Sequence, residues 1–244
     1  MKLRFLIAIL ILASGYLFSS CKKSQDKKDL WQAKQAVASP VSDAACLSGS
    51  VKGTMLAGKT YTVCGDIIIN DGDTLIMQEG VTINFTGPYG IGVKGSLISL
   101  GTKDHPNWIT YAGATKTDTP GTDPSTDSAY KGRWIGIIGG PACPMMILKW
   151  THVEFAGKAI PTSSAIHQIY TKPYDLFFQN PSGIFVFEDS WVYGSTDDPL
   201  RMLGGKIAVL RSTFEKCGYT GGEAMNAKAG TIGDFAYNLC IGMA

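Results

Sequence analysis

The chain has 244 residues, enough for one sizeable domain, and its 45% of hydrophobic residues can fill a core. Its formal charge is +2, but Lys2 and Arg4 lie in an N-terminal segment that we expect to be removed. The remaining 20 basic and 20 acidic residues balance. This balance argues against a nucleic-acid partner, because phosphate binding needs a concentrated basic face.

Residues 1–20 are predicted to be a secretory signal peptide. A basic start is followed by an apolar run over residues 5–12 and then by small residues. The run is too short to span a bilayer, which takes about 20 residues, although a transmembrane anchor is the alternative. "LFSSC" resembles the lipobox of bacterial lipoproteins, with Phe18 where Leu is commoner. The resemblance implies cleavage before Cys21 and acylation of its thiol, which would attach the protein to a lipid bilayer.

Residues 21–45 are predicted to be a tether between this cysteine and the folded domain. The segment is charged at first and then small and polar, a composition that favours a flexible chain. Within it, "DLWQAKQAVA" at residues 29–38 suits a short helix that caps the folded domain.

Residues 46–244 are predicted to form one all-β domain. From Tyr61 onward, short β-branched or aromatic segments succeed one another and are separated by Gly, Asn or Asp. Apolar residues alternate within them, as at Val81, Ile83 and Phe85, which is typical of strands with one buried face. No stretch has a convincing helical period, so the helical crossovers of a βαβ fold are not expected.

Internal repetition predicts a solenoid. Four segments align on Val153, Trp191, Phe214 and Leu239. The last two spacings are similar, and an inserted loop would explain the longer first one. A repeat of about 23–25 residues with several strands suits coils that bury their faces on one another. A sandwich or jelly roll is the alternative, but it predicts tight hairpins, and only Asp71-Gly72 clearly fits one.

The coil motifs also resemble a known group of proteins. "TLIMQEGVTINF", "GSLISLGTKDHPNWITY", "GRWIGI" and "STDDPLRMLGG" are similar to the right-handed parallel β-helix lipoproteins of Bacteroidetes-type bacteria, which share a pectin-lyase-like fold. The resemblance covers roughly residues 60–244 and implies a right-handed, single-stranded parallel β-helix. It implies no particular activity, since the group has none that is settled. One departure is that "PLRM" comes after Asp197-Asp198, where the group usually has Gly and aromatic residues.

The end of the sequence predicts that further coils are missing. The chain stops at "CIGMA", a strand-like segment with no polar or charged cap. Because an open coil exposes unpaired backbone, a solenoid needs a terminal cap. We therefore expect the β-helix to be incomplete at its C-terminus.

The cysteines predict a disulfide rather than a metal site. Cys46 and Cys64 bracket the entry to the first coil, and an exported protein meets oxidising conditions. Cys217 and Cys240 would stack on adjacent coils only if the repeat matched their separation, and the alignment of Phe214 with Leu239 favours a longer one. There is no Cys-x-x-Cys pair, so we expect no structural zinc and no cofactor.

Two polar insertions interrupt the coils, and the second is the predicted glycan-binding segment. The first, residues 114–132, is expected to be a mobile loop. The second, residues 158–183, holds Tyr170, Tyr174, Phe177 and Phe178 among Thr, Gln and Asn. Aromatic faces beside amides and hydroxyls suit a sugar-binding surface. The alternative is that these rings fold back onto the solenoid flank.

The weak catalytic candidates are Asp197, Asp198 and Arg201. Hydrolysis of a glycosidic bond needs two carboxylates that flank it, about 5–9.5 Å apart. Adjacent strand residues point to opposite faces, so Asp197 and Asp198 make a poor pair unless a turn redirects them. Turn aspartates commonly accept backbone hydrogen bonds, and Gly204-Gly205 would permit a sharp corner nearby.

These features predict a lipid-anchored protein of the outer membrane or cell surface that presents a β-helix as a binding or structural module. A polysaccharide is the expected ligand, and catalysis is not expected from these residues. A polysaccharide lyase or hydrolase of pectin-lyase-like fold is one alternative. An adhesin or a scaffold for other surface proteins is another. Fold alone does not decide among them.

Overall fold

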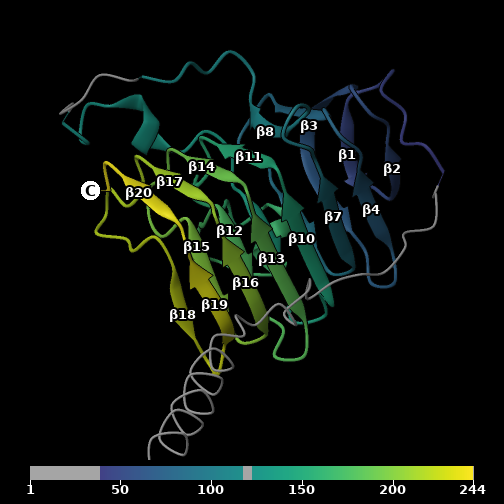
Figure 1. The fold of residues 1–244 in the computed structure, drawn as a ribbon. Coiled ribbons are helices and arrows are strands. Elements are labelled where there is room, and N and C mark those ends of the chain that lie inside the picture. The colour runs from purple at the N-terminus through teal and green to yellow at the C-terminus, as the bar shows by residue number, and fades with distance from the viewer. Residues whose placement is uncertain (1–38, 118–122, 244) are drawn as a thin grey trace, which may run out of the picture. The chain divides into compact units, whose positions relative to one another are not determined.

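The computed structural model describes residues 39–117 and 123–243. The predicted signal peptide, Cys21 and the predicted helix at residues 29–38 therefore lie outside the described residues. Within the described part, the strands pair in parallel and build two sheets. Successive turns of the chain stack on one another, as in a β-helix-like solenoid (Figure 1).

One sheet has seven strands in the order β19-β16-β13-β10-β7-β4-β2. Neighbours in this sheet are mostly three elements apart in the chain, because the intervening strands belong to the other sheet. The strands are β2 (Gly53–Met55), β4 (Thr74–Met77), β7 (Ser96–Leu100), β10 (Met145–Lys149), β13 (Ile184–Glu188), β16 (Lys206–Leu210) and β19 (Ile232–Ala236).

The other sheet has thirteen strands, and its two arms meet at the long strand β3 (Thr60–Ile69), with β1 (Leu47–Ser50) beside it. Each full coil contributes one strand to the seven-stranded sheet and one to each arm. The first arm contains β5 (Thr82–Phe85), β8 (Asn107–Tyr111), β11 (Thr151–Glu154), β14 (Trp191–Tyr193), β17 (Thr213–Glu215) and β20 (Leu239–Ile241). The second arm contains β6 (Ile91–Val93), β9 (Ile137–Gly139), β12 (Leu176–Phe178), β15 (Leu200–Leu203) and β18 (Asn226–Lys228).

The coil without insertions is slightly shorter than the predicted repeat. Thr74 pairs with Ser96, and Ile184 pairs with Lys206, so two separate coils have the same length. The last coil is longer, since Lys206 pairs with Ile232. The two predicted insertions lengthen the coils that lead from β7 to β10 and from β10 to β13.

The predicted alignment of the coils is wrong by one residue at two positions. Val153 pairs with Val192, and Phe214 pairs with Val192 and Cys240. Trp191 and Leu239 belong to the neighbouring column. Because strand residues alternate between two faces, a slip of one residue exchanges inward and outward side chains. The alignment therefore mixes two inward residues with two outward ones.

The interior is a continuous apolar core between the sheets. The seven-stranded sheet and both arms contribute inward-facing side chains that are fully buried. Burial of such side chains stabilises by about 1.5–3 kcal/mol each, before conformational entropy is subtracted. The core includes Leu97, Leu148, Phe187 and Val209 of the seven-stranded sheet, Ile109, Val153, Val192 and Phe214 of the first arm, and Ile137, Leu176 and Leu200 of the second arm.

A column of polar side chains fixes the corner between the seven-stranded sheet and the first arm. Asn107 Oδ1 accepts the backbone N–H of Val81 at 2.9 Å, and Ser190 Oγ accepts that of Thr151 at 3.0 Å. Ser212 and Asn238 continue the column in the later coils. Each bond joins one coil to the next, so buried backbone donors are satisfied and the strands of the first arm stay in register.

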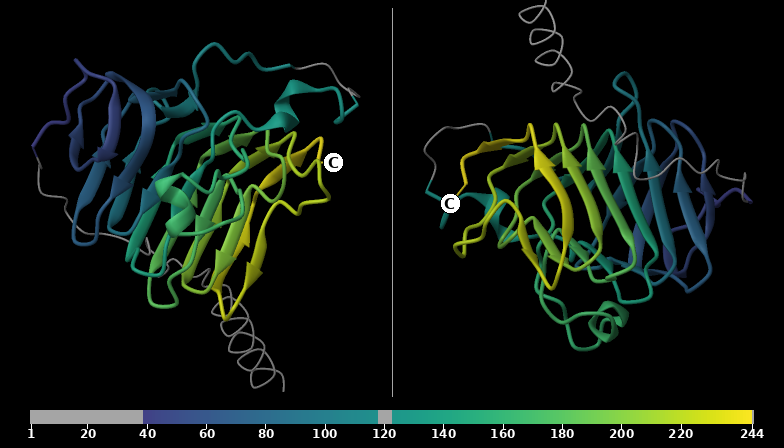
Figure 2. Two further views of the ribbon diagram at one scale, coloured as in Figure 1. Left: turned by 180° about the vertical axis from the view of Figure 1, so that it is seen from behind. Right: turned by 60° about the horizontal axis from the view of Figure 1, so that its bottom comes forward.

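The two insertions leave the coil at the same corner, after the first arm, and pack on different faces (Figure 2). The first carries the short helix η1 (Ser128–Lys131) and reaches the outer face of the first arm, where Thr117 N donates to Tyr193 Oη at 2.8 Å. The second carries η2 (Ala165–Gln168) and packs on β3 and β6. There Asp66 accepts hydrogen bonds from the Ser164 hydroxyl and the Ala165 amide.

Cys46 and Cys64 form a disulfide, which is the pairing that the sequence suggests. It ties the segment at β1 to β3, where the solenoid begins. Cys217 and Cys240 are both free. The register partner of Cys240 is Phe214 rather than Cys217, so the two cysteines do not occupy one register column.

Candidate functional site

Three flat side chains form a row on the outer face of the first arm. Trp108, His152 and Trp191 come from β8, β11 and β14 and are register partners of one another. Each precedes a fully buried aliphatic residue, so the alternation of the strand turns the rings outward. We call these three residues the ring row.

The rings of this row stack on one another. The Trp108 and His152 centroids lie 4.0 Å apart at an interplanar angle of 16°, and His152 and Trp191 lie 5.7 Å apart at 25°. Lys116, from the first insertion, places Nζ 5.6 Å from the Trp108 ring centroid and 5.1 Å from that of Trp191. A cation over indole faces is attracted to their electron density. The lysine also pairs with the buried carboxylate of Glu154.

His152 is neutral at physiological pH. Its burial, and secondarily the charge of Lys116, lower its pKa to about 4. Its Nδ1 and the Nε1 of Trp191 have no hydrogen-bond partner among the described residues. The ring row is therefore an uncharged, largely apolar strip, and these two polar ring atoms are buried within it.

A depression of about 260 Å³ opens beside Trp191 and His152. The ring row ends at Trp191. The next register partner is Thr213, and its side chain is too short to continue the stack. The corner residues Trp150, Asp189 and Arg211 also line the depression, together with Ser190, Lys103 and Pro106. Its wall therefore combines two indoles with hydroxyl, ammonium and carboxylate groups.

The corner residues are held in a backbone conformation that glycine usually adopts. Trp150, Asp189 and Arg211 have φ of 48°, 49° and 51°. This left-handed turn recurs in successive coils, each time one residue before the polar column, and it points the three side chains outward. Arg211 donates to both carboxylate oxygens of Asp189 at 2.7 Å, a bidentate pair that fixes both groups at the rim.

The predicted glycan-binding aromatics are not an exposed surface, which corrects that expectation. Phe177 and Phe178 belong to strand β12 rather than to a loop, and both are fully buried. Tyr174 is only 3% exposed, and half-buried Tyr170 stacks on Phe177 with centroids 3.8 Å apart. Tyr170, Tyr174 and Phe177 pack with Ile160 and other aliphatic residues of the second insertion and second arm. These three rings fold back onto the solenoid flank, the alternative left open by the sequence, whereas Phe178 belongs to the interior core.

Asp198 and Arg201 form a structural contact. Asp198 is 3% exposed; its Oδ2 accepts from Arg201 Nη1 at 3.0 Å, and its Oδ1 accepts the Glu223 amide of the next coil at 2.9 Å. Burial raises its pKa, with the Asp197 charge adding to this effect. Arg201 also lies over the Tyr174 ring, 5.5 Å from its centroid. Both Asp198 oxygens are thus committed to holding the β14–β15 turn against its neighbours.

The sequence contains the signal for the ring row, but reading it requires the correct register. "NWI", "THV" and "SWV" each place the row residue between a polar residue and a buried aliphatic one. Without the one-residue correction of the alignment, Trp191 appears to be an inward residue, and the row cannot be recognised.

Comparisons of the chain with protein-family models, with curated proteins and with solved structures found no match. The described residues contain no group of three or more His, Cys, Asp or Glu side chains arranged to hold a metal ion. No helix within the same residues is long and apolar enough to cross a membrane. The ring row and the depression beside it are therefore the features on which a function can be proposed.

Proposed function

We propose that this protein is an exported, lipid-anchored module that binds glycan through the ring row and its depression. The observation that carries the proposal is the row itself, three flat side chains turned outward on consecutive coils. Aromatic side chains at a protein surface combine a large apolar face with polar edges. A sugar ring has matching chemistry, with C–H faces and a rim of hydroxyls.

The polar groups around the depression support this ligand class. Thr213, Asp189 and Arg211 supply hydroxyl, carboxylate and guanidinium groups within one small cavity. The Asp189–Arg211 pair fixes these groups before a ligand arrives, so less entropy is lost on binding. A few fixed polar groups beside apolar walls are typical of small-molecule sites.

The location and the finer fold are part of the same proposal. The lipobox-like segment before Cys21 supports acylation and attachment to the outer membrane or cell surface. Parallel coils with short corners support a right-handed, single-stranded β-helix of pectin-lyase-like type, because parallel crossovers are almost always right-handed. A domain attached through acylated Cys21 would present the side of its solenoid to polysaccharides at the cell surface.

A binding screen tests this function. The purified protein is titrated against neutral, uronate-containing and sulfated polysaccharides by affinity electrophoresis, alongside Trp191→Ala. We expect at least one polysaccharide to bind, and the variant to bind about two- to tenfold more weakly, since an aromatic contact contributes roughly 0.5–1.5 kcal/mol.

Tyr219→Ala is the control, because Tyr219 is an aromatic residue at the surface, 41% exposed, that lies outside the depression. It should bind like the unmodified protein. Binding of no polysaccharide, or equal loss in both variants, would remove the basis of the proposal. Tyr174 and Phe178 are unsuitable test positions because both are buried.

A further inference from the structure

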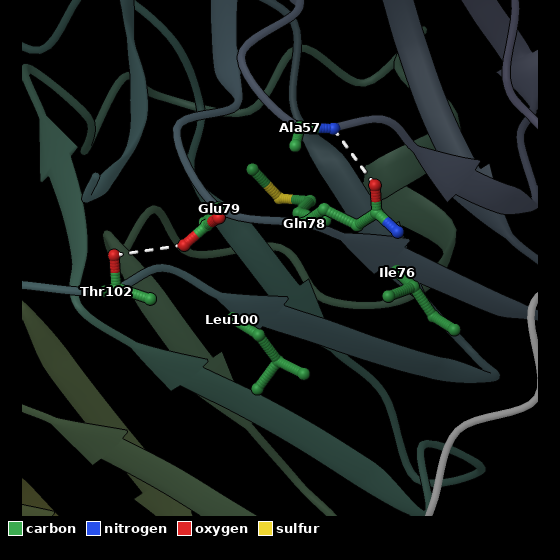
Figure 3. Close-up of a pocket in the computed structure, with 7 residues that line it drawn as sticks. Ala57, Ile76, Gln78, Glu79, Leu100 and Thr102 are labelled. Carbon is green, nitrogen blue, oxygen red and sulfur yellow. Dashed lines mark hydrogen bonds between the residues drawn. The ribbon is translucent and has the colours of Figure 1, made fainter. Parts of the chain in front are cut away.

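A second depression of about 380 Å³ lies on the same corner of the solenoid (Figure 3). It is lined by residues at the ends of β4 and β7 and just beyond β2, β4 and β7. The ring-row depression is lined by residues of the corners after β7, β10, β13 and β16 and of the strands β11, β14 and β17. Thr102 lines the second depression and Lys103 lines the first. The two hollows are therefore adjacent, separated at that point by a single peptide bond.

The second depression also combines apolar and polar groups, but its apolar part is aliphatic rather than aromatic. Ile76 and Leu100 form an apolar floor, and Gln78, Glu79 and Thr102 supply polar groups (Figure 3). Gln78 Oε1 accepts the Ala57 amide at 3.0 Å, and Glu79 Oε2 accepts from the Thr102 hydroxyl at 3.2 Å. These bonds fix both side chains and leave the Gln78 amide nitrogen without a partner in the described part of the chain.

From these two hollows we infer that the ligand is a polymer, which runs along the solenoid axis and occupies both. This inference rests on the proposed glycan-binding function and names its ligand. The corners after β4 to β16 span five coils, or about 19 Å at a strand spacing of about 4.8 Å. One sugar unit cannot cover that length. An extended β-linked chain advances by roughly one strand spacing per unit, so its units can track the coils.

The charges indicate a neutral polymer. Among the lining residues of the two depressions, Glu79 and Asp189 are acidic and Lys103 and Arg211 are basic. His152 is neutral, since burial lowers its pKa to about 4. The balance of two acidic and two basic groups gives no net attraction for a chain of uronates or sulfates. The ligand class is therefore an uncharged, extended β-1,4-linked polysaccharide.

The test is the dependence of affinity on chain length. Calorimetry compares gluco-, xylo- and manno-oligosaccharides, all β-1,4-linked, at two and six units. We expect at least one hexamer to bind about tenfold or more tightly than its dimer, because it reaches the second depression. Equal affinity for dimer and hexamer overturns the inference, and so does the failure of all three hexamers to bind.

Variants of the second depression test whether the higher affinity of the hexamer comes from contacts in this depression. Gln78→Ala and Leu100→Ala should each remove much of the hexamer's advantage and leave dimer affinity within about twofold. Thermal melting checks that both variants fold. Lys94→Ala, at an exposed position on another corner, is the control and should change neither affinity. Unchanged hexamer binding in both depression variants contradicts the inference.

The outcomes separate this inference from the proposed function. If a charged polysaccharide binds in a Trp191-dependent manner while the neutral hexamers do not, the glycan-binding function stands and the neutral-polymer assignment fails. If neither charged nor neutral chains bind, both fail.

Discussion

Replacing Lys216 with methionine is expected to cost about 3–5 kcal/mol of folding free energy, because it leaves a buried carboxylate without its cation. Lys216 Nζ lies 2.8 Å from Asp127 Oδ2, and the two side chains are 11% and 1% exposed. The lysine also donates to the carbonyl oxygen of Thr117. It thus joins the end of β17 to two points of the first insertion.

The ionised form of Asp127 is stabilised in the fold. Burial opposes ionisation, but hydrogen bonds from Lys216, the Ala129 amide and Thr117 outweigh it and lower the pKa. For a carboxyl with a lowered pKa, the stabilisation is present above its ordinary pKa of about 3.9 and is lost as the pH falls through the folded value. The effect of Lys216→Met should therefore be largest near neutral pH.

Urea unfolding at pH 7 measures the effect, with Lys131→Met as the control. Lys131 lies in the same insertion as Asp127 but is exposed, so replacing it should lower the free energy of unfolding by less than about 1 kcal/mol. The double variant Lys216→Met/Asp127→Asn should recover part of the loss, since neither charge is then left unpaired. A cost below about 1 kcal/mol for Lys216→Met would show that the pair does not hold the insertion.

Replacing Asp175 with asparagine is expected to stabilise the protein at pH 7 by about 1–3 kcal/mol. Asp175 is fully buried at the corner before β12, and neither carboxylate oxygen has a hydrogen-bond partner among the described residues. Burial raises its pKa well above the ordinary value. The nearby Ser195 hydroxyl, which donates to the Asp197 carbonyl oxygen, opposes this rise without cancelling it, and the charge of Asp197 adds to it.

The sign of the pH dependence is set by this shift. Below the ordinary pKa of about 3.9, both folded and unfolded chains are protonated and the residue costs nothing extra. As the pH rises, the unfolded chain releases its proton first, so stability falls until the raised folded pKa is reached. Asparagine has no proton to release, and its advantage should appear at pH 7 and vanish near pH 3.5.

Urea unfolding at these two pH values tests the prediction. Asp71→Asn, in an exposed turn, is the matched control and should show no comparable change. An equal loss of stability for Asp175→Asn at both pH values would contradict an uncompensated buried carboxyl.

The solenoid could be predicted from the sequence because its signals are local. Alternation at Val81, Ile83 and Phe85, and the recurrence of strands with short corners, indicate parallel coils without reference to distant contacts. The disulfide of Cys46 and Cys64 could be predicted in the same way, from the position of both residues at the first coil.

The candidate site could not be predicted, because it depends on register and on where an insertion folds. The ring row exists only when Trp191 is paired with His152, and a slip of one residue hides it. The aromatics of the second insertion have the composition of a sugar site, but hydrophobic burial on Ile160 and its neighbours takes Phe177 out of solvent. Composition alone does not show which of two aromatic groups stays partly accessible to solvent.

The most direct test of the central claim is the ¹⁵N–¹H spectrum of the tryptophan indoles, recorded while the tightest-binding polysaccharide of the screen is added. We predict that the Trp191 Nε1–H resonance shifts in proportion to occupancy. Trp134, a fully buried residue whose Nε1 donates to the Glu154 carbonyl at 2.7 Å, should stay unchanged as the internal reference. Binding that leaves the Trp191 resonance in place, or that moves Trp134 equally, would contradict a glycan site at the ring row.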